Sequence, residues 1–469
     1  MLFIHENYMR DLFLLAFRAS AKIICNIEHD GDPGMQCIQS IFKTAGAVSL
    51  LSAILISGVI ADDLRDIYDQ AKSNDAQYRA AGYTLEASRE AKPLAKSGLL
   101  PQVVLNAGTT WGNGDSYSGS NNTGSASLDL TQPLFNRGNF MQYKQADSVV
   151  AKAEAEYTTE EQGLIIRVAE AYFNVLAAED NLRFTRSETK AIYNQLDQAK
   201  QRYEVGLIAI TDVHEAQASY DNARSNQIQA NNELDNAREA LRVIVGGGSI
   251  GELAKLKPSI PLRRPNPSSL DYWSKQALEN NPSVSAAHQA VEIARKEVEV
   301  KKSGHYPTLD LVASKSEVWD SPSTGTDFSD EMIGLQLTLP IYLGGSVSSN
   351  VRKTRHELKA ALESYEGQKR LANRQVRDAY RGVESAISQV KALQASTVSA
   401  QSALDATTAG YEVGSRTLVD VLIAQRNLFG ARSNYASARY QYVLNGLYLR
   451  QAAGNLSESD LDDVNKLLK

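Results

Sequence analysis

The sequence predicts a mainly α-helical protein with a small β part, in which long antiparallel coiled-coil helices are combined with four short strands. Three observations predict this class. Apolar residues recur every seventh position over stretches longer than an ordinary helix, two pairs of short segments alternate apolar with polar residues, and the whole pattern occurs twice. Only 12 prolines in 469 residues leave room for helices of that length.

The first 61 residues are typical of a targeting segment. Lys43 precedes an uncharged apolar run over 45–60, and Val59-Ile60-Ala61 offers small residues for a signal peptidase. We expect a leader over 1–61, with the signal peptide over 35–61 and an upstream extension that reflects start-codon choice. The mature chain then begins at Asp62. A transmembrane anchor is the alternative, although the run is short for one.

Composition argues against several functions. The net charge of −6 gives no sign of the positively charged surface that binds nucleic acid. Cys25 and Cys37 both lie in the leader, which leaves no thiol chemistry in the mature chain. The remaining histidines lack metal-ligand spacing: His214, His288, His305 and His356. We therefore expect no metal, no cofactor and no nucleic-acid partner.

The mature chain is a tandem repeat. Tyr203-Glu204-Val205-Gly206 returns as Tyr411-Glu412-Val413-Gly414, and Ala223-Arg224-Ser225-Asn226 returns at the same offset as Ala431-Arg432-Ser433-Asn434. The predicted organisation is a first repeat over 62–254, a Pro-rich linker over 255–269, a second repeat over 270–456 and a tail over 457–469.

Each repeat contains a long helix and a returning helix, expected over 138–246 and 346–454. The seven-residue spacing keeps one stripe facing a neighbour only in a left-handed supercoil. About 65 helical residues span roughly 95 Å, too long for a globular core, so these helices must pair laterally. The stripes run through Val168, Val175, Leu182, Thr189, Leu196 and Tyr203, and through Val376, Val383, Val390, Thr397, Leu404 and Tyr411.

Two hairpins are expected over 102–135 and 308–341. Their strands are predicted over 103–111, 127–135, 309–318 and 333–341, with loops over 112–125 and 319–331. Alternation of apolar and polar residues gives each strand the two faces of an outer-membrane strand. Trp111 and Trp319 lie at matching hairpin ends, where an interfacial aromatic belt places them.

Four strands cannot close a barrel, and exposed sheet edges are not tolerated in lipid. The barrel must therefore be shared between copies of the chain. Two copies supply eight strands and three supply twelve, and composition does not decide between them.

The sequence contains patterns that resemble enzyme motifs, but the segments that flank them do not suit those motifs. The glycine-rich segment 246–251 matches nucleophile-elbow and dinucleotide-binding patterns, but both require a preceding strand and a following helix. Here a long helix ends and a loop follows. We expect no catalytic residues and no enzyme.

Several stretches together resemble the TolC family of outer-membrane efflux and type I secretion channel proteins. They are 191–203, 205–213, Pro307-Thr308-Leu309-Asp310-Leu311, Leu339-Pro340-Ile341-Tyr342 and 411–422. The resemblance implies a homotrimer with a periplasmic α-barrel and a shared twelve-strand outer-membrane β-barrel. It implies an exit duct for multidrug efflux and type I secretion, working with a periplasmic adaptor and an inner-membrane RND, ABC or MFS transporter. It also implies contact with outer-membrane lipid.

The resemblance also assigns residues at the periplasmic tip. A closing network is expected from Thr211, Asp212, Tyr411 and Arg416, with Gln201 assisting. Tyr411 is expected to bond Asp212 within a chain, and Arg416 to reach Thr211 and Asp212 of a neighbour. Asp420 is expected to form an acidic ring, although Ile423 stands where the family has a second acid. The adaptor is expected to dock at Gly206, Leu207, Gly414 and Ser415.

Simpler interpretations exist for these residues. Asp212 and Asp420 begin returning helices, where the helix dipole favours any acid, and Thr417 with Asp420 suggests a capping box. Gly206 and Gly414 suit the left-handed position that ends a helix. A periplasmic coiled-coil scaffold leaves the alternating hairpins unexplained, and a passive porin leaves the long helices unexplained. The exported substrates and the transporter class are not determined by the sequence.

Overall fold

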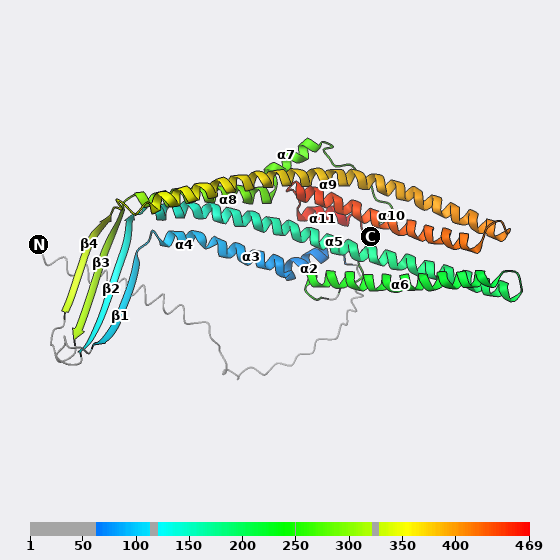
Figure 1. Ribbon diagram of the computed structural model, residues 1–469, viewed down its shortest axis with the longest axis horizontal. Helices are drawn as coiled ribbons and strands as arrows, with labels where there is room; N and C mark the ends of the chain where they lie inside the picture. The colour runs from blue at the N-terminus through cyan, green and yellow to red at the C-terminus, as the bar shows by residue number, and fades with distance from the viewer. Residues whose placement is uncertain (1–61, 113–120, 249, 321–327) are drawn as a thin grey trace, which may run out of the picture. The chain divides into compact units, whose positions relative to one another are not determined.

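The computed structural model describes residues 62–112, 121–248, 250–320 and 328–469. The expected leader and its two cysteines lie outside these ranges. Within them, two long helical hairpins lie beside each other, and their turns are at the end opposite a four-stranded sheet (Figure 1). The same order of elements occurs twice along the chain.

The elements before the linker are α2 (Leu64–Asn74), α3 (Ala76–Arg89), α4 (Ala91–Ser97), β1 (Gln102–Gly112), β2 (Asn121–Phe135), α5 (Arg137–Glu204) and α6 (Ile210–Val245). Those after it are α7 (Leu270–Asn280), α8 (Pro282–Lys302), the short 3-10 helix η1 (Ser303–His305), β3 (Thr308–Asp320), β4 (Phe328–Thr338), α9 (Ser346–Glu412), α10 (Leu418–Ala452) and α11 (Glu458–Asn465).

The helical segments before the two hairpins differ. In the second repeat α8 is continuous, with its only proline at the first position. In the first repeat the chain breaks between α3 and α4 at Glu90. Pro93 has no N–H to bond the carbonyl of Arg89, so a continuous helix is interrupted there. The first repeat therefore has two helices, α3 and α4, where the second has α8 alone.

The long helices match the seven-residue pattern. α5 has 68 residues and α9 has 67, and they return through α6 and α10, with 36 and 35. The expected stripe is buried at Val168, Val175 and Leu182. It is buried again at Val376 and Val383. The stripe stays buried to Leu196 in α5 but only to Val390 in α9, and Tyr203, next to the first turn, is 44% exposed.

Among the helices of the described residues, none combines the length and the apolar character needed to cross a membrane.

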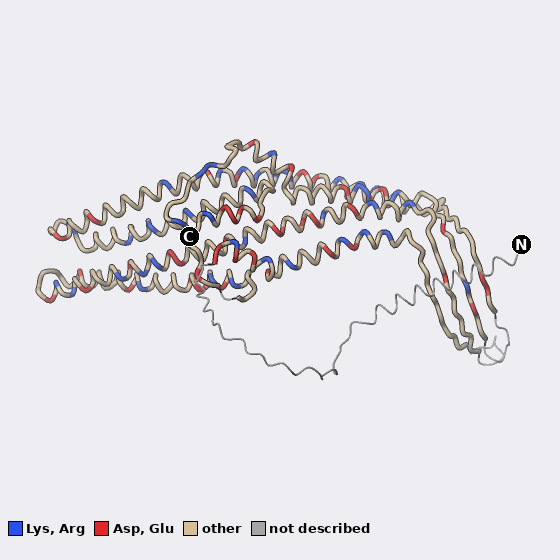
Figure 2. The backbone as a smooth tube through the Cα atoms, turned by 180° about the vertical axis from the view of Figure 1, so that it is seen from behind, with Lys and Arg blue, Asp and Glu red and all other residues tan. Residues whose placement is uncertain are grey.

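The sheet is antiparallel, in the order β1-β2-β3-β4. Within the described residues no strand pairs with the outer edge of β1 or of β4. A single chain therefore presents two unpaired edges, which natural proteins usually cover or pair. In Figure 2 the sheet carries few charged residues, whereas both signs of charge occur along the helices.

Strand pairing divides the sheet into two faces. Leu105, Leu128 and Leu130 lie on one face with Ile333 and Leu335, because cross-strand partners share a face. The opposite face is polar: Asn106 donates a 3.0 Å hydrogen bond to Asp129, and Ser127 donates one of 2.9 Å to the same carboxylate. One face is therefore suited to lipid and the other to water.

The strand ends differ from expectation. β2 begins at Asn121 and β4 at Phe328, so both loops are shorter than predicted. β4 ends at Thr338 instead of continuing to Ile341. Pro340 lacks an N–H for the ladder, which limits strand pairing at this position.

The tail over 457–469 contains a helix that the sequence analysis did not identify. Leu461 and Val464 of α11 are buried in the main core with Leu64 of α2. Glu458 accepts hydrogen bonds from Arg65 (2.7 Å) and Lys72 (2.5 Å), and the bond from the Lys72 ammonium lowers the pKa of Glu458 most. The tail is therefore a packed element that covers α2.

Candidate functional site

Both hairpin tips are built by the same turn. Gly206 and Gly414 have φ of 77° and 79°, the left-handed region that favours glycine. In the first turn Gly206 N–H bonds the Tyr203 carbonyl and Leu207 N–H bonds the Arg202 carbonyl, both at 2.9 Å. Gly414 and Ser415 repeat this pair of bonds at 3.0 and 2.8 Å. These are Schellman motifs, and the predicted helix-ending role of both glycines is confirmed.

The returning helices start differently. At the start of α10, Asp420 N–H donates to the Thr417 hydroxyl (3.2 Å), and the Asp420 carboxylate accepts from Thr417 N–H (3.0 Å). This is a capping box, as the simpler interpretation of Asp420 predicted. The bond from Thr417 N–H is the main reason that the pKa of Asp420 lies below its usual value, with a smaller contribution from Arg416.

Asp212 has the same position in α6 but no capping partner. The preceding residue, Ala209, has no side-chain acceptor, and no side-chain cap is formed there. Within the described residues the Asp212 carboxylate accepts no hydrogen bond and forms no ion pair. It is half-buried, whereas Thr211 beside it is exposed. Asp212 is thus the acid of the pair whose carboxylate remains available to another group.

Tyr411 is held by a residue that the sequence analysis did not identify. The guanidinium of Arg202, in the last turn of α5, lies over its ring at 5.1 Å from the centroid. No hydrogen bond joins Tyr411 to Asp212 in the part of the chain that the structure describes. Gln201 instead donates a 2.9 Å bond to Asp197 on its own helix. The expected network is therefore not assembled within a single chain.

Arg416 folds back over the last turn of α9. A Cβ atom at Gly410 would lie 2.8 Å from Arg416 Cγ, so a larger residue there would require the Arg416 side chain to shift. At the same offset in the first repeat, Arg202 replaces Gly410 and Ile208 replaces Arg416. Each tip thus carries one arginine, at exchanged positions. Comparison of the two repeats could have identified Arg202 from the sequence.

A small apolar cluster joins the two hairpins near their tips. Leu418 and Leu422 of α10 are buried among residues of α5 and α6, with Ile208 and Tyr411 packed against them. The buried members from the first hairpin are Ile192, Leu196, Ala199, Val213, Ala216 and Ala223. Asp420 lies between the two leucines in sequence, and Ile423 is 47% exposed.

The turns expose apolar side chains to solvent. Leu207 is 73% exposed and Val413 is 80% exposed, beside the glycines and the exposed Ser415. Exposed apolar residues at the end of a helical hairpin are unusual without a partner, and such patches commonly mark protein contacts.

The two hairpin tryptophans lie on the apolar face of the sheet. Trp111 is 73% exposed and Trp319 is 48% exposed. Trp319 lies across Gly124 on the paired strand, where an added Cβ would be 2.2 Å from the indole nitrogen. Their position at one end of the strands matches that of an interfacial aromatic belt.

No group of three or more His, Cys, Asp or Glu residues that could hold a metal ion occurs among the described residues.

Comparison with known proteins identifies this architecture. The family model described as "Outer membrane efflux protein" matches residues 67–247 and 273–455. Outer membrane protein TolC of Vibrio cholerae is 38% identical over 427 residues, covering 90% of this chain and 97% of that protein. The alkaline protease secretion protein AprF of Pseudomonas aeruginosa is 29% identical over 424 residues, covering 88% of each. The Campylobacter jejuni CmeC outer membrane channel superposes with a TM-score of 0.74 at 17% identity, covering 93% and 97%.

The fold and these comparisons define an outer-membrane channel protein with long helices and a sheet that forms part of a shared β-barrel. More narrowly, the chain belongs to the outer membrane efflux protein family and is similar to TolC over most of its length.

Proposed function

We propose that three copies of this chain form one exit duct for efflux and type I secretion. The observation that supports this most directly is the open four-stranded sheet with one apolar face. Its free edges require partners in lipid, and three copies supply the twelve strands of the family's barrel.

The proposed gate lies at the helical tips. Asp212 has an unbonded carboxylate, and Arg416 forms no ion pair within the described chain. A bond from Arg416 of one copy to Thr211 and Asp212 of the next satisfies both, and charge-assisted bonds of this kind are strong. Tyr411 adds a bond to Asp212 when the two hairpins of a chain approach.

The exposed turns are the proposed docking site for a periplasmic adaptor. Gly206 and Leu207 belong to the turn between α5 and α6, and Gly414 and Ser415 to the turn between α9 and α10, and both turns lie at the end opposite the sheet (Figure 1). Recruitment of the adaptor by an inner-membrane transporter would then act directly on the residues that close the duct.

The first experiment measures mass and conductance on the same purified protein. The detergent-solubilised particle is expected to have the mass of three chains and a small conductance in planar bilayers. Tyr411→Phe combined with Arg416→Ser should raise that conductance several-fold. The bonds lost are worth about 1.5–3 kcal/mol each, enough to shift a nearly balanced gate. A monomer, or a double mutant that folds and conducts like the wild type, would contradict the proposal.

The acidic ring has its own test. Three Asp420 carboxylates around an axis should trap a trivalent cation added on the periplasmic side. Because Ile423 replaces the second acid, block should be intermediate and easily relieved by salt. Asp420→Ala should show little block and Ile423→Asp tight block. If Asp420→Ala is blocked as strongly as the wild type, Asp420 acts only as a helix cap.

A periplasmic scaffold function, against which the family membership argues, predicts a different fractionation. The mature protein would then be recovered without detergent, which fractionation of the native cells measures directly. N-terminal sequencing of the membrane fraction also tests whether the mature chain begins at Asp62.

A further inference from the structure

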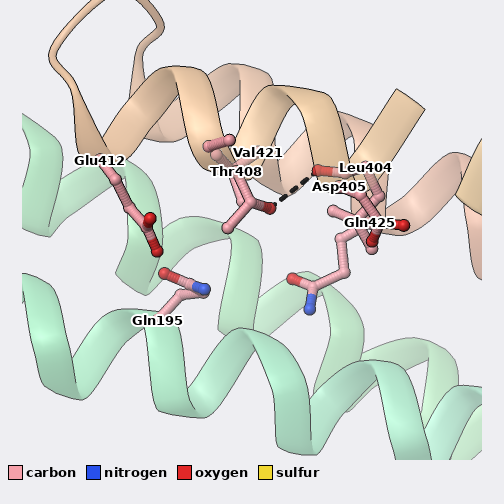
Figure 3. Close-up of a pocket in the computed structure, with 8 residues that line it drawn as sticks. Gln195, Leu404, Asp405, Thr408, Glu412, Val421 and Gln425 are labelled. Carbon is pink, nitrogen blue, oxygen red and sulfur yellow. Dashed lines mark hydrogen bonds between the residues drawn. The ribbon is translucent and has the colours of Figure 1, made fainter. Parts of the chain in front are cut away.

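A cavity of about 350 Å³ that is open to solvent lies between the two hairpins, close to the tips, and its acids Asp405 and Glu412 are exposed (Figure 3). Gln195 of α5 lines one side, and α9 and α10 line the other with Asp405, Thr408, Glu412 and Gln425. The cavity is separate from the gate network, because none of Thr211, Asp212, Tyr411 and Arg416 lines it.

Gln425 is the side chain in this cavity whose bonding is incomplete. It is only 9% exposed, yet its Oε1 accepts no hydrogen bond. Figure 3 shows its amide directed into the space between Gln195 and α9. A buried amide oxygen without a donor costs free energy comparable to a lost hydrogen bond, so this position favours a ligand that donates.

The rest of the lining also accepts rather than donates. Thr408 uses its hydroxyl hydrogen on the Leu404 carbonyl (2.8 Å), which leaves its oxygen lone pairs available. Glu412 forms no ion pair in the described chain, and Asp405 accepts a single 2.9 Å bond from Gln401. No described residue that lines the cavity is Lys, Arg or His. Two carboxylates without a counter-charge select a cation.

The spacing of the acids indicates the shape of that cation. Asp405 and Glu412 are two turns apart on α9, roughly 10 Å along the axis, so one metal ion cannot contact both. A linear polyamine can place one ammonium group near each carboxylate and donate to Gln425 from the segment between them. We propose that this cavity is a binding site for a linear polyamine.

The test uses spermidine as the probe and butylamine as the single-charge comparator. Calorimetry is performed on the full-length detergent-solubilised protein carrying Asp420→Ala, which removes the proposed cation ring at the tip. Spermidine is expected to bind once per chain and butylamine far more weakly. Gln425→Leu and Glu412→Gln should each lower the affinity for spermidine about tenfold, as expected for the loss of a charged hydrogen bond.

Two further variants make the result decisive. Gln425→Glu keeps an acceptor and adds a charge, so it should tighten spermidine binding. Glu363→Gln removes an exposed acid elsewhere on α9 and should leave binding unchanged. The proposal is overturned if spermidine does not bind, if butylamine binds equally well, or if correctly folded Gln425→Leu and Gln425→Glu bind as their parent does.

Discussion

The two hairpins end in the same turn but are packed differently. In α5, buried residues continue almost to the tip, through Ile192, Leu196 and Ala199. In α9 the last buried residue is Val390, although the helix continues to Glu412. Near the tips the second hairpin contacts the first through Leu418 and Leu422 of its returning helix, whereas farther from the tips α10 packs into the main core. The two hairpins therefore share one backbone turn but differ in packing near it. The first has a buried core close to its tip, whereas α9 of the second leaves exposed surface there for a different contact.

This difference assigns separate roles to the two hairpins. The first supplies a packed support that carries the unbonded carboxylate of Asp212. The second supplies a capped helix start and two long side chains, those of Tyr411 and Arg416. In the gate that we propose, one part must stay in place while another moves, and the weaker packing of α9 near the tip leads us to expect that the second hairpin moves.

The largest expected effect is on stability, and it comes from two leucines at matching positions of the two repeats. Leu196 is 1% exposed, whereas Leu404, at the same heptad position, is half-buried. Leu196→Ala should cost about 2–5 kcal/mol through lost burial and a new cavity, and Leu404→Ala about 1 kcal/mol or less. Thermal unfolding followed by circular dichroism measures both. Equal losses would show that another subunit buries Leu404 in the assembled protein.

The helix starts provide the next comparison. Thr417→Ala removes the hydroxyl that accepts from Asp420 N–H and should cost about 1 kcal/mol. Ala209→Ser adds the cap that α6 lacks and should gain a similar or smaller amount. Hydrogen exchange of the first-turn amides should therefore accelerate in α10 and slow in α6. If both variants leave exchange unchanged, the two helix starts do not differ in capping.

Arg202 tests the link between the hairpins. Its contact with the Tyr411 ring is a cation–π interaction, worth about 0.5–1 kcal/mol at a solvent-accessible site. Arg202→Gln should shift the ratio of open to closed duct about two- to fivefold. Arg202→Lys keeps the charge and should fall between Gln and the wild type. A shift that is the same for both substitutions would exclude stacking on the ring as the cause.

The smallest expected effect is a pH dependence at Asp420. Its pKa lies below the usual 3.8 because its carboxylate accepts bonds from Thr417. The unfolded state therefore takes up the proton first, so the stabilisation is present above pH 3.8 and is lost as the pH falls through the lower folded value. The unfolding midpoints of wild type and Asp420→Asn should differ near neutral pH and converge in acid. A constant difference would contradict this linkage.

Much of this architecture could be predicted from the sequence, because it depends on regular patterns. Heptads specify which helix faces pack, alternation specifies the faces of the sheet, and glycines at equivalent positions specify the turns. The break at Glu90 was also encoded, in Pro93, but a single proline is easily missed within a helical pattern.

Other features depend on contacts between distant segments. The stacking of Arg202 on Tyr411 joins helices of different repeats, and periodicity says nothing about such pairs. The packing of α11 on α2 likewise brings together residues nearly the whole chain apart. The residue assignments carried from a resemblance predicted a bond between Tyr411 and Asp212 within one chain, and no such bond is formed among the described residues.

The short segment over 252–257 is bonded on both sides by remote parts of the chain. Asp62 N–H bonds the Glu252 carbonyl at 2.9 Å, and Ala254 N–H bonds the Asp62 carbonyl at 3.1 Å. Lys255 and Lys469 exchange bonds of 3.2 and 2.9 Å, and Lys257 N–H bonds the Leu467 carbonyl at 2.9 Å. The first half of the polypeptide is thus attached to the last residues of the second half through the start of the linker. Two fragments divided after this segment, within 258–267, should therefore find each other and reassemble when produced separately.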